Sequence, residues 1–452
     1  MSPHGGTVET ASHGVLFGMD PLWLSTILLI VSYVVLLSEK FNRTVVALLG
    51  GGLVVVTGVI SQSQAIAAVD FNTIALLTGM MIIVAVTRTS GVFEFVAIWS
   101  AKKVKADPMG ILLVLSVVTA VFSAFLDNLT TVLLVVPVAL LIVEKLKVSP
   151  YPFLISQILA SNIGGTATLI GDPPNILIGS ATGLSFMQFL TNLGPVSLMV
   201  LIIMVPIFKI MWGKELVATD KARESIMRFR EVDSITDMRL LVMSLGVLAL
   251  VIAGFIIGEH YHIPPGTTAM TGAAFLLLIT SLGLESEEQT ELLHGALIEV
   301  EWAALLFFIG LFIIVAGVEH AGLLNILGAA MMEFTGGDAA MTAISTLWLS
   351  AIVSAAVDNI PFVATMIPLV ESMEAGLGGA DALEPVWWSL ALGACLGGNG
   401  SLVGAAANVM VSGLGERAGY PISFIRFLKI GLPLMLMTVA IANVYVYLRY
   451  FL

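Results

Sequence analysis

Long apolar segments follow one another along almost the whole chain and are separated by short polar loops. Apolar segments of about 17 or more residues can cross the ~30 Å hydrocarbon core of a bilayer as helices. The alternating segments of ~10 residues typical of a membrane β-barrel do not occur. The pattern therefore predicts an all-α polytopic membrane protein with about ten spans. They are expected at residues 22–39, 44–61, 73–88, 151–184, 193–212, 240–258, 267–284, 303–318, 385–413 and 430–448.

Polar residues inside the apolar segments recur in a second copy. The segment DNLTTVLLVVP begins at Asp127, and DNIPFVATMIP begins 231 positions later at Asp358. GGTATLIGDPPN at 164–175 is matched, 233 positions later, by GGNGSLVGAAAN at 397–408. Duplicated, interrupted transmembrane segments are typical of secondary transporters whose binding site lies at the interface of the two repeats.

Two apolar segments, 109–146 and 341–373, are predicted to be re-entrant hairpins. Lysines flank the first segment on both sides, and a hairpin keeps both groups on the cytoplasmic side, as the positive-inside rule prefers. With an external N-terminus, eighteen of the 19 basic residues then lie at the cytoplasmic face, and only Arg449 lies outside. The second hairpin then enters from outside, so the two halves have inverted topology.

This topology divides the chain into three parts. Residues 1–212 form the first inverted repeat, with the broken span 151–184, and residues 240–452 form the second, with the broken span 385–413. The only long polar segment, 213–239, is predicted to be a cytoplasmic linker. No signal peptide is expected at the N-terminus, which lacks a basic region and a cleavage site. The expected location is the inner (plasma) membrane.

Composition agrees with this class and argues against others. The chain is 58% hydrophobic and 11% charged, whereas soluble domains carry about 25% charged residues. Its single cysteine and six scattered histidines form no metal-binding pattern. A phosphate-binding loop for ATP hydrolysis is absent. We therefore expect no enzyme, no metal site, no nucleic-acid partner and no cofactor, with a proton or sodium gradient as the driving force.

The aspartates at the hairpin tips are the first candidate functional groups. A carboxylate inside a membrane is costly, so Asp127 and Asp358 suggest a functional site. Aspartate also favours helix N-caps, and each could simply cap the second arm of its hairpin. The two roles are compatible, because a cap directed at a cavity also directs the helix dipole there. Asp127, Asp358 and Asp172 are the candidates for proton or cation coupling, although the repeat counterpart of Asp172 is Ala405.

Glycine pairs and prolines are predicted to break the spans 151–184 and 385–413, because glycine is a weak helix former and proline lacks an N–H. The freed backbone groups and nearby side-chain oxygens would then face the centre of the protein. Close helix contacts at glycine are the alternative. The candidate substrate-binding residues are Asn128, Thr130, Asn162, Gly165, Thr166, Asn175, Asn359, Gly398, Asn399, Ser401 and Asn408. No lysine or arginine lies in these motifs, so a substrate held by side-chain positive charge is not expected. The remaining substrate classes are a cation, a neutral polar solute, or an anion held by helix N-termini.

These motifs resemble the ion-transporter superfamily, and in particular the group of arsenite permeases, NhaD-type sodium–proton antiporters and melanosomal P proteins. The resemblance rests on SAFLDNLTTVLLVVP at 123–137, GGTATLIGDPPN at 164–175 and SAAVDNIPFVATMIP at 354–368. It implies an inverted-repeat fold with a scaffold part and a transport part, proton or sodium coupling, and often a homodimer. Sodium–dicarboxylate transporters share this plan but have Ser-Asn-Thr tips, so the carboxylates here argue against a dianionic substrate.

Proton-coupled efflux of arsenite or antimonite by alternating access is the function that the resemblance favours. Arsenite near neutral pH is a small neutral triol that needs hydroxyl and amide partners, and a single cysteine excludes a trithiolate site. Exchange of sodium or lithium for protons is the alternative, because carboxylate and carbonyl oxygens suit a hard cation. An anion or dicarboxylate transporter is the third possibility. A channel, or a membrane subunit served by a peripheral ATPase, is a further one, although the duplicated hairpins disfavour a channel.

Overall fold

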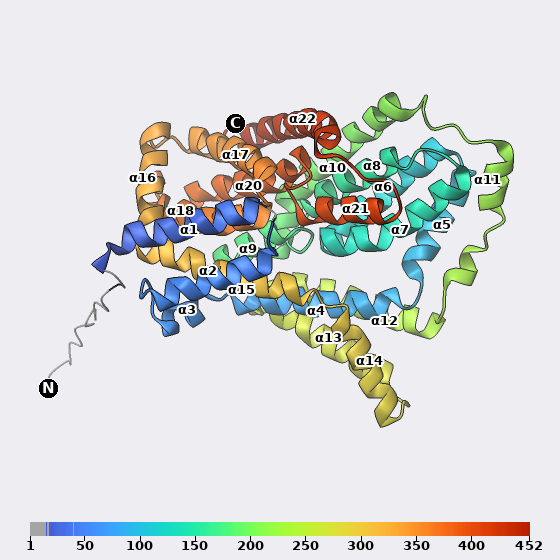
Figure 1. The fold of residues 1–452 in the computed structure, drawn as a ribbon, viewed down its shortest axis with the longest axis horizontal. Coiled ribbons are helices and arrows are strands. Elements are labelled where there is room, and N and C mark those ends of the chain that lie inside the picture. The colour runs from blue at the N-terminus through green and yellow to red at the C-terminus, as the bar shows by residue number, and fades with distance from the viewer. Residues whose placement is uncertain (1–14, 16–17, 39) are drawn as a thin grey trace. The chain divides into compact units, whose positions relative to one another are not determined.

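The computed structural model describes residues 15, 18–38 and 40–452. Every regular element in this part of the chain is helical, which confirms the all-α fold class (Figure 1). The expectations about the N-terminus, its external side and its lack of a signal peptide, concern residues outside the described part.

The first half of the chain contains ten helices in the described ranges. They are α1 (Pro21–Leu37), α2 (Arg43–Val56), α3 (Gln62–Ala68), α4 (Phe71–Arg88), α5 (Val92–Lys103), α6 (Pro108–Phe125), α7 (Asn128–Leu146), α8 (Tyr151–Gly165), α9 (Pro173–Thr182) and α10 (Phe186–Trp212). The polar segment that follows contains α11 (Asp220–Met227) and the short 3₁₀ helix η2 (Glu231–Ser234).

The second half repeats this order. Its helices are α12 (Met238–Gly258), η3 (Glu259–Tyr261), α13 (Pro265–Ser281), α14 (Ser286–Ile298), α15 (Trp302–His320), α16 (Leu323–Thr335), α17 (Ala339–Ala356), α18 (Asn359–Ser372), α19 (Glu374–Leu377), α20 (Ala380–Gly397), η4 (Gly398–Gly400), α21 (Ala406–Arg417) and α22 (Phe424–Tyr450). Both halves therefore carry a hairpin followed by a broken helix.

Eight described helices are long and apolar enough to cross a membrane: α4, α6, α7, α10, α12, α15, α17 and α22. The helices α5 and α16 were not among the expected spans. They have 12 and 13 residues, or roughly 20 Å at 1.5 Å per residue, which is too short to cross. They begin 231 positions apart, at Val92 and Leu323, and so belong to the repeat.

The described residues form two compact units. One contains the chain up to Asp70 together with Leu306–Leu327, and the other contains Phe71–Leu305 and Gly328–Leu452. All candidate site residues lie in the second unit.

Each unit contains one helix crossing that the repeat predicts. In the first unit, a Cβ atom added at Gly310 of α15 would lie 2.4 Å from the carbonyl carbon of Ala47 in α2. In the second unit, a Cβ atom added at Gly79 of α4 would lie 2.5 Å from the carbonyl carbon of Ala269 in α13. Gly79 and Gly310 are repeat counterparts, and each lets two backbones approach more closely than any side chain would allow. A helix of one half therefore packs on a helix of the other half in both units.

The predicted hairpins are present as α6–α7 and α17–α18. The first arm of each ends at one extended residue, Leu126 or Val357, and an aspartate then caps the second arm. The predicted breaks are also present, because helix is lost between Gly165 and Pro173 and between Gly400 and Ala406. Re-entry of the hairpins into the bilayer stays a prediction.

Candidate functional site

Each hairpin packs against the broken helix of its own half, and the contacts are nearly the same in both halves. The hydroxyl of Ser123 in α6 donates a hydrogen bond to the carbonyl oxygen of Ser161 in α8, at 2.7 Å. The hydroxyl of Ser354 in α17 donates to the carbonyl oxygen of Ala394 in α20, also at 2.7 Å. In Figure 1, α17 lies beside α20. The two hairpin–helix pairs are therefore two copies of one structural unit.

The hairpin tips place carboxylates at the start of the second arms. The backbone N–H of Thr130 donates to Asp127 Oδ1 at 2.9 Å, and the hydroxyl of Thr130 donates to Asp127 Oδ2. In the second hairpin, the N–H of Ile360 donates to Asp358 Oδ1 at 3.1 Å. Asp127 is buried and Asp358 is half-buried. Both aspartates thus act as N-caps, and both lie within electrostatic range of Asp172.

Two asparagine side chains hold the broken helices in shape. Asn175 Nδ2 donates to three carbonyl oxygens of the first break, the shortest bond being 2.9 Å to Thr168. Asn408 Nδ2 donates to the carbonyl oxygens of Gly398 and Ser401, at 2.7 and 2.8 Å. These bonds satisfy backbone groups that the lost helical turns leave free. The amide nitrogens of both residues are therefore used to hold the breaks, and their side-chain oxygens also have protein partners, Cys395 for Asn175 and Asn162 for Asn408.

A cluster of buried asparagines joins the two halves. Asn162 Nδ2 donates to Asn399 Oδ1 and to Asn408 Oδ1, both at 3.0 Å. Asn128 Nδ2, next to the first hairpin tip, makes a long bond of 3.5 Å to Asn162 Oδ1. We call these four residues the asparagine cluster. It brings together candidates separated by up to 280 positions and places them at the junction of the repeats, where transporter sites occur.

Asp172 lies at the end of the first break and is fully buried. Asn359, from the second hairpin, donates its Nδ2 to Asp172 Oδ1 at 3.3 Å. Asp172 Oδ2 accepts no hydrogen bond, although the uncharged thiol of Cys395 lies near this carboxylate, and Asn399 Nδ2 has no hydrogen-bond partner either. The repeat counterpart of Asp172 is Ala405, which is also fully buried. The two halves are thus alike in backbone but unequal in charge at this one position.

The remaining candidates are engaged with the backbone. The hydroxyl of Thr166 donates to the carbonyl oxygen of Asn162 at 2.7 Å, and the hydroxyl of Ser401 donates to the carbonyl oxygen of Ala355 at 2.5 Å. Gly165 and Gly398 allow close backbone approach, since an added Cβ would lie 2.6 and 3.1 Å from carbonyl oxygens across the breaks. These residues shape the breaks and place the asparagine cluster.

Sequence reasoning missed some members of the site. The buried thiol of Cys395 contacts Asn175 Oδ1 at 3.4 Å, and no local pattern indicates this contact. Ser123 and Ser354 could have been found, because they are 231 positions apart and precede the Asp-Asn tips equally. No lysine or arginine takes part in the hydrogen bonds described above. Within the described residues, no group of three His, Cys, Asp or Glu side chains is arranged to hold a metal ion.

Residues 33–393 match a family model described as citrate transporter. The chain belongs to the citrate-transporter family. An uncharacterized transporter of Mycobacterium tuberculosis is 42% identical over 426 residues, which cover 93% of this chain and 97% of that protein. This chain is therefore a multi-pass membrane protein and a secondary transporter of the ion-transporter kind. The superfamily predicted from the motifs is confirmed.

Two further comparisons concern one of the predicted groups and the fold. The P protein of Homo sapiens is 30% identical over 503 residues, which cover 93% of this chain and 59% of that protein. The YdaH transporter of Alcanivorax borkumensis has a TM-score of 0.60 at 12% identity and covers 96% of this chain and 99% of its own. At that identity the match concerns the fold alone.

Proposed function

We propose that this member of the citrate-transporter family is a proton-coupled carrier and that Asp172 carries the coupled proton. One observation carries the proposal: Asp172 is fully buried within a network that spans both halves, and its Oδ2 has no partner. Burying an unpaired charge costs several kcal/mol, so this carboxylate needs a proton or a cation as its partner. Alternating access would then exchange that proton for the substrate.

Arsenite and antimonite are our first candidate substrates, and efflux is the proposed direction. Both are small neutral hydroxylated solutes that need hydrogen-bond donors and acceptors and no opposite charge. Asp172 Oδ2 offers an acceptor from the first half, and Asn399 Nδ2 offers a donor from the second half. Filling these two buried, unpartnered groups would favour binding, since an unmade buried hydrogen bond costs about 1–3 kcal/mol.

Exchange of sodium or lithium for protons is the second candidate. The carboxylates of Asp127 and Asp358 lie within electrostatic range of Asp172, which supports binding of a hard cation held by oxygen ligands. Citrate, which the family model names, is less well supported, because its charges would meet the carboxylates of Asp127, Asp172 and Asp358. Citrate or another anion would therefore have to enter protonated or together with cations. Homodimer formation and a peripheral ATPase remain proposals.

The test uses purified protein in liposomes that contain a pH-sensitive dye, with an imposed pH gradient and no ATP. Arsenite, antimonite, NaCl, LiCl and citrate are added separately, and proton flux is recorded. The variant Asp172→Asn should reduce substrate-triggered proton flux at least tenfold. The control Asp381→Asn, at an exposed acid in the first turn of α20, should leave it unchanged.

The outcomes separate the candidates. Flux triggered by arsenite or antimonite but not by sodium would support the metalloid carrier. Flux triggered only by sodium or lithium would assign the protein to cation exchange, and flux triggered only by citrate would assign it to anion transport. Full pH-dependent transport by the Asp172→Asn variant would overturn the role of this carboxylate in each case.

A further inference from the structure

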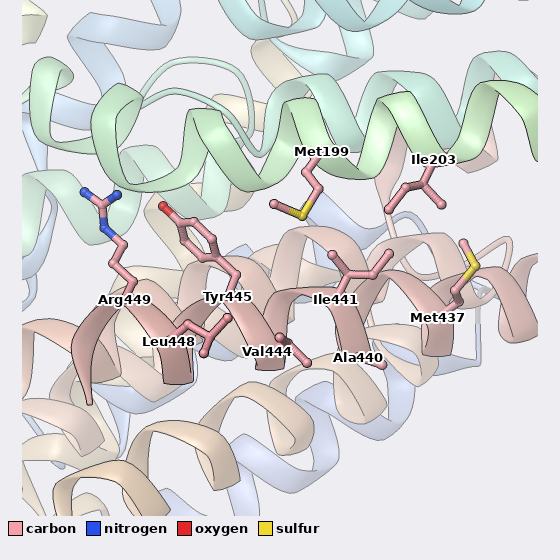
Figure 2. A pocket seen from close by; sticks show the side chains of 9 residues that line it. All are labelled: Met199, Ile203, Met437, Ala440, Ile441, Val444, Tyr445, Leu448 and Arg449. Carbon is pink, nitrogen blue, oxygen red and sulfur yellow. The ribbon is translucent and has the colours of Figure 1, made fainter. Parts of the chain in front are cut away.

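A groove of about 680 Å³ runs between α10 and α22, the helices that follow the two broken helices in the chain (Figure 2). Its walls are apolar and its end is polar. Met199 and Ile203 of α10 line one side, and Ile441, Val444, Tyr445 and Arg449 of α22 line the other (Figure 2). Both helices are long and apolar enough to cross a membrane, so hydrocarbon chains are the natural surroundings of such walls.

The charged end of the groove is a built arrangement. Arg449 Nε donates to Asn192 Oδ1 at 3.1 Å, and the hydroxyl of Tyr450 donates to the same oxygen at 2.7 Å. The hydroxyl of Tyr445 donates to the backbone carbonyl oxygen of Asn192, also at 2.7 Å. The guanidinium carbon lies 5.7 Å from the centres of both tyrosine rings. These contacts hold the guanidinium in place through Nε, beside the two tyrosine hydroxyls.

Arg449 forms no ion pair with a carboxylate in the part of the chain that the structure describes, whereas Arg88, Arg223, Arg228 and Arg230 each form one. The acid that acts on this end of the groove is Glu384, which affects Tyr450 without pairing with Arg449. On the predicted topology Arg449 is also the only basic residue at the outer face. A guanidinium at the end of a transmembrane groove, flanked by tyrosines of the kind found at membrane interfaces, matches the geometry that binds phosphate.

We propose that this groove binds an anionic phospholipid, with one acyl chain along the apolar walls and the phosphate on Arg449. The long apolar part of the groove fits an acyl chain, and the single charge at its end fits an anionic headgroup. Basic pockets between transmembrane helices are known to bind acidic lipids in this way. A second copy of the chain would fit less well. Neither α10 nor α22 contains an aspartate or glutamate, so a symmetric contact between these helices would leave Arg449 uncompensated.

The experiment measures lipid binding to the full-length protein in a neutral detergent by native mass spectrometry. The probes are phosphatidylglycerol, phosphatidylcholine with the same chains, and glycerol phosphate without chains. Arg449→Gln removes the charge, and Val444→Trp obstructs the groove at a residue that is 55% exposed. Arg417→Gln, at an exposed arginine in the last turn of α21, is the matched control.

Phosphatidylglycerol should bind roughly fivefold more tightly than phosphatidylcholine, and Arg449→Gln should abolish this preference. Val444→Trp should weaken both lipids, and Arg417→Gln should change neither. Equal binding of the two lipids by the natural protein would overturn the proposal, and so would binding of glycerol phosphate as tightly as phosphatidylglycerol. A dimer that Val444→Trp dissociates would identify the groove as an interface between copies and would also overturn it.

Discussion

The asparagine cluster gives the sharpest test of how the two halves are tied together. Asn162 supplies two hydrogen bonds of 3.0 Å, to Asn399 Oδ1 and to Asn408 Oδ1. Replacing Asn162 by leucine keeps a similar shape but removes both donors. Asn399 and Asn408 are almost fully buried, so their side-chain oxygens would be left without partners away from water.

The magnitude follows from the two lost bonds. An orphaned buried polar group costs about 1–3 kcal/mol in soluble proteins. Interhelical hydrogen bonds in a membrane protein are weaker, averaging about 0.6 kcal/mol with a maximum of about 1.7 kcal/mol. The Asn162→Leu variant should therefore lose roughly 1–3 kcal/mol of unfolding free energy, with the membrane values setting the lower end.

The assay is reversible unfolding in mixed micelles, followed by circular dichroism as the denaturing detergent increases. A double-mutant cycle between Asn162→Leu and Asn399→Leu isolates one bond and should give a coupling energy of about 0.6–1.7 kcal/mol. Asn325→Leu, the same change at an exposed position of α16, should stay within about 0.5 kcal/mol of the natural protein. A coupling energy below about 0.3 kcal/mol would refute the view that this amide bond ties the halves together.

Two further predictions concern packing and the polar linker. Gly397→Ala would place a Cβ 2.6 Å from the backbone oxygen of Ala351 and should lower the unfolding free energy by about 1–3 kcal/mol. The control Gly413→Ala places its Cβ in open space and should raise the unfolding free energy by less than about 1 kcal/mol. Equal effects of the two variants would contradict the packing argument. The Lys102 ammonium beside Glu231 holds the pKa of that carboxyl below its usual value of 4.5, so this contact stabilises the linker above that pH and loses its effect as pH falls through the lowered folded value. The amide hydrogen-exchange rate of residues 213–239 should rise in that acidic range, and Glu231→Gln should remove this pH dependence. The same pH dependence in the variant would contradict a role of the Lys102–Glu231 contact.

Much of the fold could be predicted because membrane helices are recognised in a sequence by their length and apolar composition. The duplicated Asp-Asn tips located both hairpins, since an aspartate between two apolar arms caps the second one. The short helices α5 and α16 were missed, because helices of 12 and 13 residues that do not span a bilayer leave no hydropathy signal of the kind used.

The residues of the candidate site could be named from the sequence, but their contacts could not. The repeated asparagines Asn175 and Asn408 lie at the breaks, and sequence spacing does not reveal which atom of an amide meets the backbone. The pairing of Asp172 with Asn359 joins residues 187 positions apart in different halves, so no local pattern could indicate it. Long-range contacts of this kind come from tertiary packing.

The difference between Asp172 and Ala405 gives the clearest link between the repeat and a directional function. The two halves have the same serine hydrogen bonds, the same close glycine contacts and the same asparagine bonds to the breaks. Positions 172 and 405 are therefore equivalent in backbone structure. Only one of these positions carries a carboxylate, and it faces Asn359 of the opposite hairpin. An inverted repeat supplies two related packings whose interchange produces alternating access. On the proposed function, a single buried acid at the junction would make those packings unequal in charge, and a proton or cation that binds it would favour one packing over the other by its difference in affinity.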